Sequence, residues 1–164
     1  GATRAYEVVV QKMPLIKEVS DFLTSANRVD PATNILVRAA VPCILDISVV
    51  IRLLDSDFED DIDTVGIRAD IVRRVANTAT GYGVLSVSLI MDAVHNYLNG
   101  RSDVGGMSTS LAATIVAPTG DVLSFFSPQE IVVPERPDLG LGRRNTAFMT
   151  STDRITIAFE RVDA

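Results

Sequence analysis

The clearest pattern in the chain is a strict alternation of apolar and polar positions between residues 42 and 54. Six side chains that share one face are apolar: Cys43, Leu45, Ile47, Val49, Ile51 and Leu53. The opposite face is more polar and includes Asp46, Ser48 and Arg52. Because successive side chains of a strand point to opposite faces, this segment is predicted to be a long, half-buried β-strand.

Three other segments repeat their apolar residues at three- and four-residue spacing, which indicates amphipathic helices. The first helix is expected to begin at Pro14, the second to open with the acidic residues 55–63, and the third to follow an N-cap at Ser88. The predicted apolar stripes are Leu15, Ile16, Val19, Phe22, Leu23 and Ala26 in the first, Ile62, Val65, Ala69, Val72, Val75, Ala76 and Ala79 in the second, and Leu89, Ile90, Ala93, Val94, Tyr97 and Leu98 in the third. Asp70 and its arginine neighbours lie outside the second stripe.

The remaining segments predict shorter elements joined by loops. The expected strands are 6–11, 35–40, 111–117, 121–126, 131–133 and 154–162, with a hairpin turn at Pro118-Thr119-Gly120. Residues 101–110 are rich in Gly and Ser and are expected to form a loop. Residues 134–152 carry prolines and glycines and are expected to form an irregular excursion.

Together these elements predict an α+β fold, in which a mixed or antiparallel sheet of about six strands has three helices packed mainly on one face. Residues 1–34 are expected to form an N-terminal strand and helix, and residues 35–164 an α+β assembly domain, with a single domain over 1–164 as the alternative. The chain begins with Gly rather than Met, which suits a piece of a longer protein.

Composition narrows the possible partners. The 164 residues carry a net charge of −6, and the largest basic clusters are the pairs Arg73-Arg74 and Arg143-Arg144. Nucleic acids and anionic membranes both attract basic surfaces, so neither is an expected partner. No apolar run reaches the length of about 20 residues that a membrane-spanning helix needs, so no membrane insertion is expected.

The residues that usually perform chemistry are scarce. His95 is the one histidine of the chain and Cys43 its one cysteine, so a single chain cannot supply the three or four ligands of a zinc site. His95 is expected on the polar flank of the third helix, and Cys43 is expected to be a buried apolar residue. We therefore expect no catalytic residues and no cofactor.

The acidic run that opens the predicted second helix is the weak candidate for a metal site. Its possible ligands are Asp55, Asp57, Glu59 and Asp61. Counted from Asp55, however, position six of a calcium loop is Asp60 rather than Gly, and position twelve is Gly66 rather than Glu. Negative charge also suits the start of a helix, which is sufficient to explain the run. No metal site is therefore predicted.

Two segments stay unexplained by core packing and are candidates for protein contacts. The excursion 134–152 contains Arg143 and Arg144, which could pair with acids on a neighbouring protein, or simply be solvated. Apolar residues in this excursion and in the loop 101–110 could add buried area to such a contact. The interface candidates are Arg143, Arg144, Leu139, Leu141 and Met107.

The order of elements from residue 35 to residue 162 resembles the carboxy-terminal region of the baseplate J-like proteins of contractile phage tails and related injection machines. The resemblance rests on Leu-Val-Arg-Ala-Ala-Val-Pro at 36–42 with the alternating strand after it, the connector Gly-Tyr-Gly-Val-Leu-Ser-Val-Ser at 81–88, and the closing Asp-Arg-Ile-Thr-Ile-Ala-Phe-Glu-Arg-Val at 153–162. These motifs are turn glycines, a capping serine and apolar periodicity.

This resemblance implies a non-enzymatic wedge component of a tail baseplate. Its partners would be other tail or baseplate proteins and copies of itself, and it would be assembled in the host cytoplasm and end in the virion. A small-molecule-binding or divalent-cation-binding regulatory domain is the alternative from the residues alone. An enzyme with dispersed carboxylates, or a fragment of a larger enzyme, is a further alternative.

Overall fold

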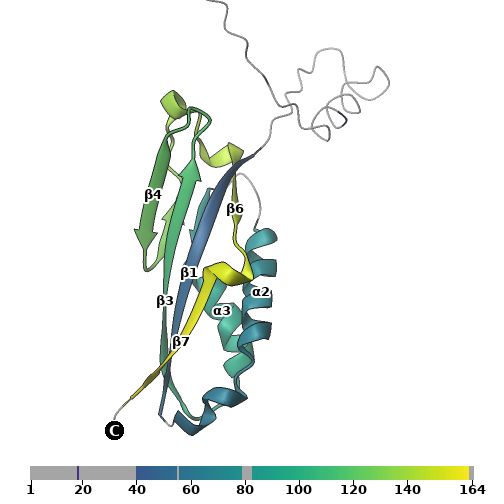
Figure 1. Ribbon diagram of the computed structural model, residues 1–164, viewed down its shortest axis with the longest axis vertical. Coiled ribbons are helices and arrows are strands. Elements are labelled where there is room, and N and C mark those ends of the chain that lie inside the picture. The colour runs from purple at the N-terminus through teal and green to yellow at the C-terminus, as the bar shows by residue number, and fades with distance from the viewer. Residues whose placement is uncertain (1–17, 19–39, 55, 79–82, 163–164) are drawn as a thin grey trace, which may run out of the picture. The chain divides into compact units, whose positions relative to one another are not determined.

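The computed structural model describes residues 18, 40–54, 56–78 and 83–162 (Figure 1). The chain divides into two units, Gly1–Ala39 and Ala40–Ala164, and the architecture below is that of the second unit. The strand expected at 6–11, most of the first helix and nearly all of the strand expected at 35–40 lie outside the described residues.

One long strand organises the second unit. β1 (Val41–Leu53) has the buried and exposed alternation that the sequence predicts. The six apolar side chains from Cys43 to Leu53 are each at most 2% exposed. Both edges of β1 are paired, since β3 lies on one side and β6 and β7 lie on the other. The alternating apolar pattern therefore belongs to the central strand of the sheet.

On one side, β1 pairs antiparallel with β3 (Val104–Val116), which pairs antiparallel with β4 (Val122–Ser127). The hairpin predicted around Pro118-Thr119-Gly120 is confirmed, and its Gly120 has a φ of 92°. The loop predicted at 101–110 is wrong, because β3 already begins at Val104. Pairing with the long β1 holds this Gly- and Ser-rich sequence extended, in spite of its weak strand propensity.

On its other side, β1 pairs with two short parallel strands in succession. β6 (Thr146–Met149) lies beside Val41–Ile44, and β7 (Ile155–Arg161) lies beside Ile47–Leu53. The excursion expected at 134–152 is thus not irregular throughout, since it contains β6. Between the two strands the chain leaves the ladder, and Thr150 Oγ1 donates to the carbonyl oxygen of Leu45 at 3.0 Å.

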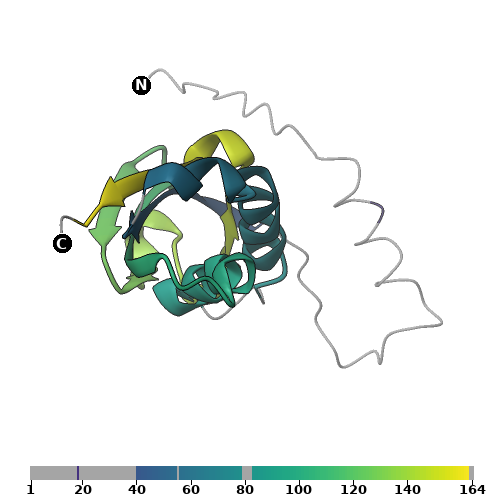
Figure 2. The ribbon, with the colours of Figure 1, turned by 90° about the horizontal axis from the view of Figure 1, so that it is seen from below.

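Two helices pack on one face of this sheet, as the end-on view shows (Figure 2). They are α2 (Thr64–Ala76) and α3 (Val87–Leu98). A separate two-stranded ladder joins β2 (Val84–Ser86) to β5 (Glu130–Val132). The described residues thus form an α+β fold with a mixed five-stranded sheet, a second two-stranded sheet and two α-helices. The helix expected to begin at Pro14 falls almost entirely on residues that are not described.

The stripe predicted for α2 is confirmed in part, since Ile62 and Val75 are buried and Val72 packs against the core, while Ala79 lies outside the described residues. Val65 is 73% exposed, and Ala69 and Ala76 are exposed as well, whereas Ile67, Asp70 and Ile71 are buried. The helix contacts both α3 and the sheet strand β6, so its buried arc follows these two neighbours rather than the apolar spacing. Arg68 also joins the fold, because its Nε donates to the carbonyl oxygen of Ile155 at 3.1 Å.

The stripe predicted for α3 is mostly confirmed, with Ile90, Ala93, Val94 and Leu98 buried. Tyr97 is an exception and is exposed. The helix begins one residue before the predicted cap, and Ser86 rather than Ser88 is the N-cap, accepting a hydrogen bond from the backbone N–H of Ser88. It ends at Asn99 and Gly100 as the sequence predicts.

Gly83 before β2 offers a test of how tightly the connector is packed. Its φ is 61°, and a Cβ built there would lie 2.5 Å from the Cβ and Cγ atoms of Arg143. Gly83→Ala should therefore lower the free energy of unfolding by about 1–2 kcal/mol, through both the backbone conformation and the clash. Chemical denaturation measures this loss.

Gly100→Ala is the matched control for that substitution. Gly100 also has a positive φ, of 84°, but a Cβ added at this position would have no heavy atom within 4 Å. The control reports the backbone cost alone, so the difference between the two variants reports the packing of Arg143 on Gly83. Equal losses in the two variants would show that this packing is loose.

Candidate interaction surface

The outer face of the five-stranded sheet is the side turned away from α2 and α3. The even-numbered residues of β1 point to it, together with their partners on β3, β4, β6 and β7. Four of its large apolar side chains are exposed: Val116, Val122, Phe126 and Met149. Phe126 is the most exposed of the four, at 72%. Large exposed hydrophobics gathered on one face of a sheet, here on β3, β4 and β6, mark a surface suited to a protein partner.

A hollow of about 380 Å³ interrupts this face where β6 gives way to β7. Its lining is mainly apolar and comes from Pro42, Ile44 and Met149, with Thr150, Ser151 and Arg154 at the break between the strands. The hollow exists because residues 150–154 leave the ladder while β1 runs straight on. A single apolar side chain from a partner would fit the apolar side of such a hollow.

The charges on the outer face are paired with one another. Arg154 Nη1 lies 2.9 Å from Asp46 Oδ1, and Arg52 Nε lies 3.2 Å from Glu160 Oε2. These two pairs add no net charge to the face, although the chain as a whole carries −6. Exposed pairs of this kind add little to stability, but they let the face approach a second protein without long-range repulsion.

The predicted interface residues fall in different environments. Leu141 is 3% exposed and belongs to the core, so it offers no contact surface. Leu139 and Met107 are half-buried and pack against the core. Met107 lies on β3 opposite Ile51, so it points to the helix-covered side of the sheet. These three side chains therefore contribute mainly to folding.

Arg143 and Arg144 are exposed, and they belong to an ordered segment rather than to a free loop. The backbone N–H of Arg143 donates to Glu135 Oε1 at 3.1 Å, and Arg136 forms two hydrogen bonds with Asp138. The Asn145 side chain closes the turn by bonding the backbone on both sides of Leu141. Many polar groups of this excursion form hydrogen bonds with one another, and the two arginines lie at its surface.

The acidic run does not open α2 as predicted, because it forms a separate 3-10 helix, Ser56–Asp61, ahead of it. Asp63 is the N-cap of α2, and its Oδ1 accepts the backbone N–H of Gly66 at 2.8 Å. Asp55 lies outside the described residues. The side chain of Asp57 also lies outside the described part of the structure. Glu59 and Asp61 are exposed, and no group of three His, Cys, Asp or Glu able to hold a metal occurs in the described part of the chain.

Cys43 and His95 have contrasting environments. Cys43 is fully buried, and burial raises the pKa of its thiol to about 12, so at neutral pH the thiol is protonated and unreactive. His95 is exposed and lines a hollow of about 350 Å³ between the end of α3 and the start of β3. Arg101 lines the same hollow and is bonded to Asp103.

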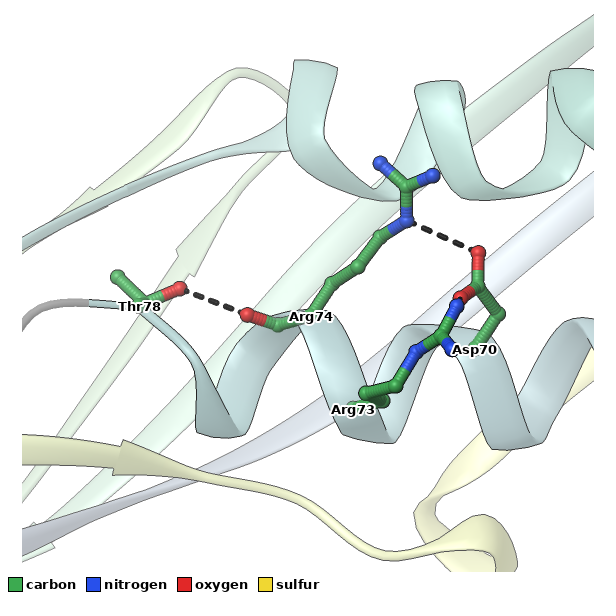
Figure 3. Close-up of polar contacts among 4 residues, drawn as sticks. All are labelled: Asp70, Arg73, Arg74 and Thr78. Carbon is green, nitrogen blue, oxygen red and sulfur yellow. Dashed lines mark hydrogen bonds and ion pairs between the residues drawn. The ribbon is translucent and has the colours of Figure 1, made fainter.

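A charged cluster on α2, with a buried aspartate at its centre, is absent from the sequence predictions (Figure 3). Asp70 is 5% exposed, Arg74 Nε lies 2.9 Å from its Oδ2, and Arg73 Nη2 bonds its Oδ1. Burial alone would raise the pKa of Asp70, but the hydrogen bonds from Arg74 and Arg73 outweigh it and lower the pKa overall. The signal in the sequence is the spacing, since Asp at i faces Arg at i+3 and i+4 on a helix.

Neither protein-family models nor curated proteins match this sequence. In the described residues, no helix combines the length and apolar character needed to cross a bilayer.

Proposed function

We propose that this chain is a non-enzymatic assembly module, of the kind found in the baseplate of a contractile phage tail or a related injection machine. The observation that carries the proposal is the outer face of the sheet, with Val116, Val122, Phe126 and Met149 exposed together. The resemblance in element order to baseplate J-like proteins supplies the kind of assembly. In this proposal the partners are other tail proteins and copies of the chain itself, within the virion.

The physical features of the outer face support an assembly role. Its exposed aromatic and aliphatic side chains would gain from leaving water, by roughly 25 cal/mol per Å² of apolar area. Its charges are already paired and need no partner to compensate them. Arg143 and Arg144 would add polar contacts elsewhere on the surface, where they can reach acids of a neighbour.

The test uses purified tail proteins encoded beside this chain, with binding to the full chain measured by interferometry. We expect at least one to bind, and Val122→Asp to weaken that binding by tenfold or more, about 1.4 kcal/mol, because a carboxylate would be buried without a partner. Val65→Asp is the matched control, since Val65 is similarly exposed but lies on α2. Binding that is equally strong in both variants, or no binding to any tail protein, would contradict the proposal.

The hollow beside His95 keeps the small-molecule alternative open, because ligand sites are typically concave and of this volume. A ligand that binds only the folded chain must raise its melting temperature. Titration with calcium or magnesium tests the divalent-cation form of this alternative, independently of the hollow, and a clear rise would favour the regulatory alternative over the assembly role.

A further inference from the structure

Phe126 on β4 and the hollow beside β6 lie on opposite sides of the middle of the outer sheet face, at matching positions along the strands. Phe126 on β4 is opposite Ala112 on β3, and Ala112 is opposite Asp46 on β1. Beyond β1, the hollow is bounded by Met149, which is opposite Ile44, and by Arg154, which bonds Asp46. Phe126 and the hollow are therefore at nearly the same level along the strands.

The spacing across the sheet is also symmetric. Strands lie about 4.8 Å apart, so β4 and β6 are each about 7 Å from a line midway between β3 and β1. Consider a two-fold axis that runs above the face and parallel to this line. A rotation of 180° about it places a second copy face to face with the first, so that β4 of one copy lies over β6 of the other. Each Phe126 then lies over the hollow of the other copy, and the same contact is made twice.

We propose that the chain forms a symmetric dimer through this face, with Phe126 of each copy inserted into the hollow bounded by Ile44, Met149 and Arg154 of the other. This inference rests on the proposed assembly role and names a second copy of the chain as the partner. Facing sheets pack about 10 Å apart, with their strands at about 30° to one another.

The side chains that lie between Phe126 and the hollow are suited to close packing of two sheet faces. Between β4 and β6, the outward positions of β3 near the axis are Ser110, Ala112 and Thr114, which are small and uncharged. The acids and arginines of the face are paired within each copy, so two faces meet without net repulsion. Elsewhere, the charge of −6 on each copy opposes random association.

The size of the face sets the expected strength of the dimer. β1 has 13 residues and is therefore about 43 Å long, and the distance from β4 to β6 is about 14 Å. Because β4 has only six residues and β6 four, this width holds over about half of the length at most, and the face is on the order of 500 Å² per copy, below the usual size of a specific protein interface. We expect a dissociation constant in the micromolar range rather than a permanent dimer.

The first experiment is sedimentation equilibrium of the full chain over a range of concentrations. The proposal predicts a reversible monomer–dimer equilibrium that Phe126→Arg weakens by at least about tenfold, because the new arginine would face Arg154 of the other copy. Val65→Arg, which changes a similarly exposed residue on α2, should leave the equilibrium unchanged. Circular dichroism of both variants verifies that the fold is intact. Unaltered dimerisation of Phe126→Arg, or a monomer at all concentrations, overturns the proposal.

A charge-pair experiment tests whether Phe126 of one copy inserts into the hollow of the other. Met149→Asp at the rim of the hollow should weaken the dimer as Phe126→Arg does. The double variant should regain dimerisation, because each arginine at position 126 then meets an aspartate at position 149 of the other copy at both symmetric contacts. If both single variants dimerise weakly and the double variant does not recover dimerisation, residue 126 does not contact residue 149 of the other copy.

A third measurement separates failure of the dimer from failure of the assembly role. If the chain is monomeric, the alkylation rate of Phe126→Cys is compared with that of Val65→Cys. Slow reaction at position 126 would show that another segment of the same chain covers the face, which overturns both proposals. Fast reaction would overturn the dimer alone and leave the face available to a different tail protein.

Discussion

Replacing Leu45 by Ala is expected to lower the free energy of unfolding by about 3 kcal/mol. Leu45 is fully buried near the middle of β1, where it faces the core beneath the helices. The backbone of β1 is held on both sides at this point, so the surrounding structure cannot collapse into the space that the substitution leaves. Urea denaturation of the two proteins measures the difference.

Leu54→Ala is the control for this prediction. Leu54 follows β1 directly and carries the same side chain, but it is about half exposed. Its truncation should change the free energy of unfolding by no more than about 0.5 kcal/mol. Similar losses at both positions would mean that burial on the inner face of β1 is not what stabilises the sheet.

Replacing Asp70 by Asn is expected to lower the free energy of unfolding by about 2 kcal/mol at neutral pH. The amide keeps the volume of the carboxylate but loses its negative charge, and its NH₂ group faces an arginine that cannot accept a hydrogen bond. Arg73 is largely exposed and Arg74 is partly exposed, so both can regain water. For this reason the loss should be smaller than for a fully buried ion pair.

The same cluster predicts a pH dependence. The pKa of Asp70 is lower in the folded chain than its ordinary value of about 3.9, so the folded state favours the ionised form. The stabilisation is therefore complete above about pH 5 and is lost as the pH falls below about 4 towards the folded pKa. Unfolding measured from pH 7 to pH 3 should show the stabilities of the parent chain and Asp70→Asn converging at acid pH.

Asp92→Asn supplies the matched control, because Asp92 is exposed on the neighbouring helix α3. This variant should keep the stability of the parent chain at neutral pH within about 0.5 kcal/mol. It should also retain the acid-dependent loss, since Asp70 is still present. A loss that persists in full in Asp70→Asn would assign the pH dependence to other carboxylates.

Local elements with a strong pattern are predictable from the sequence. The alternation from Cys43 to Leu53 is sufficient to place β1 and its buried face, because a strand in contact with a core on one side must alternate. The turn at Gly120 and the end of α3 at Gly100 are also predictable, since both need a positive φ that glycine adopts readily.

Elements that depend on partners distant in the sequence are not predictable in this way. Residues 104–110 form a strand because β1 is long enough to pair with them, and β6 forms because Val41–Ile44 leaves an edge open. Local spacing places Asp70 on the polar side of α2, together with the arginines. Its burial follows from the packing of α2 against α3, which local spacing does not specify.

The sequence by itself determined the class of fold, the central strand and its inner face, and the scarcity of residues suited to catalysis. Tertiary structure decided which outward side chains form one surface. Phe126, Met149 and Arg154 share no local motif in the sequence, and the register of β4, β3, β1 and β6 places them on one face. Strand register is set by long-range pairing, so the candidate interaction surface could be found only after the strands were aligned.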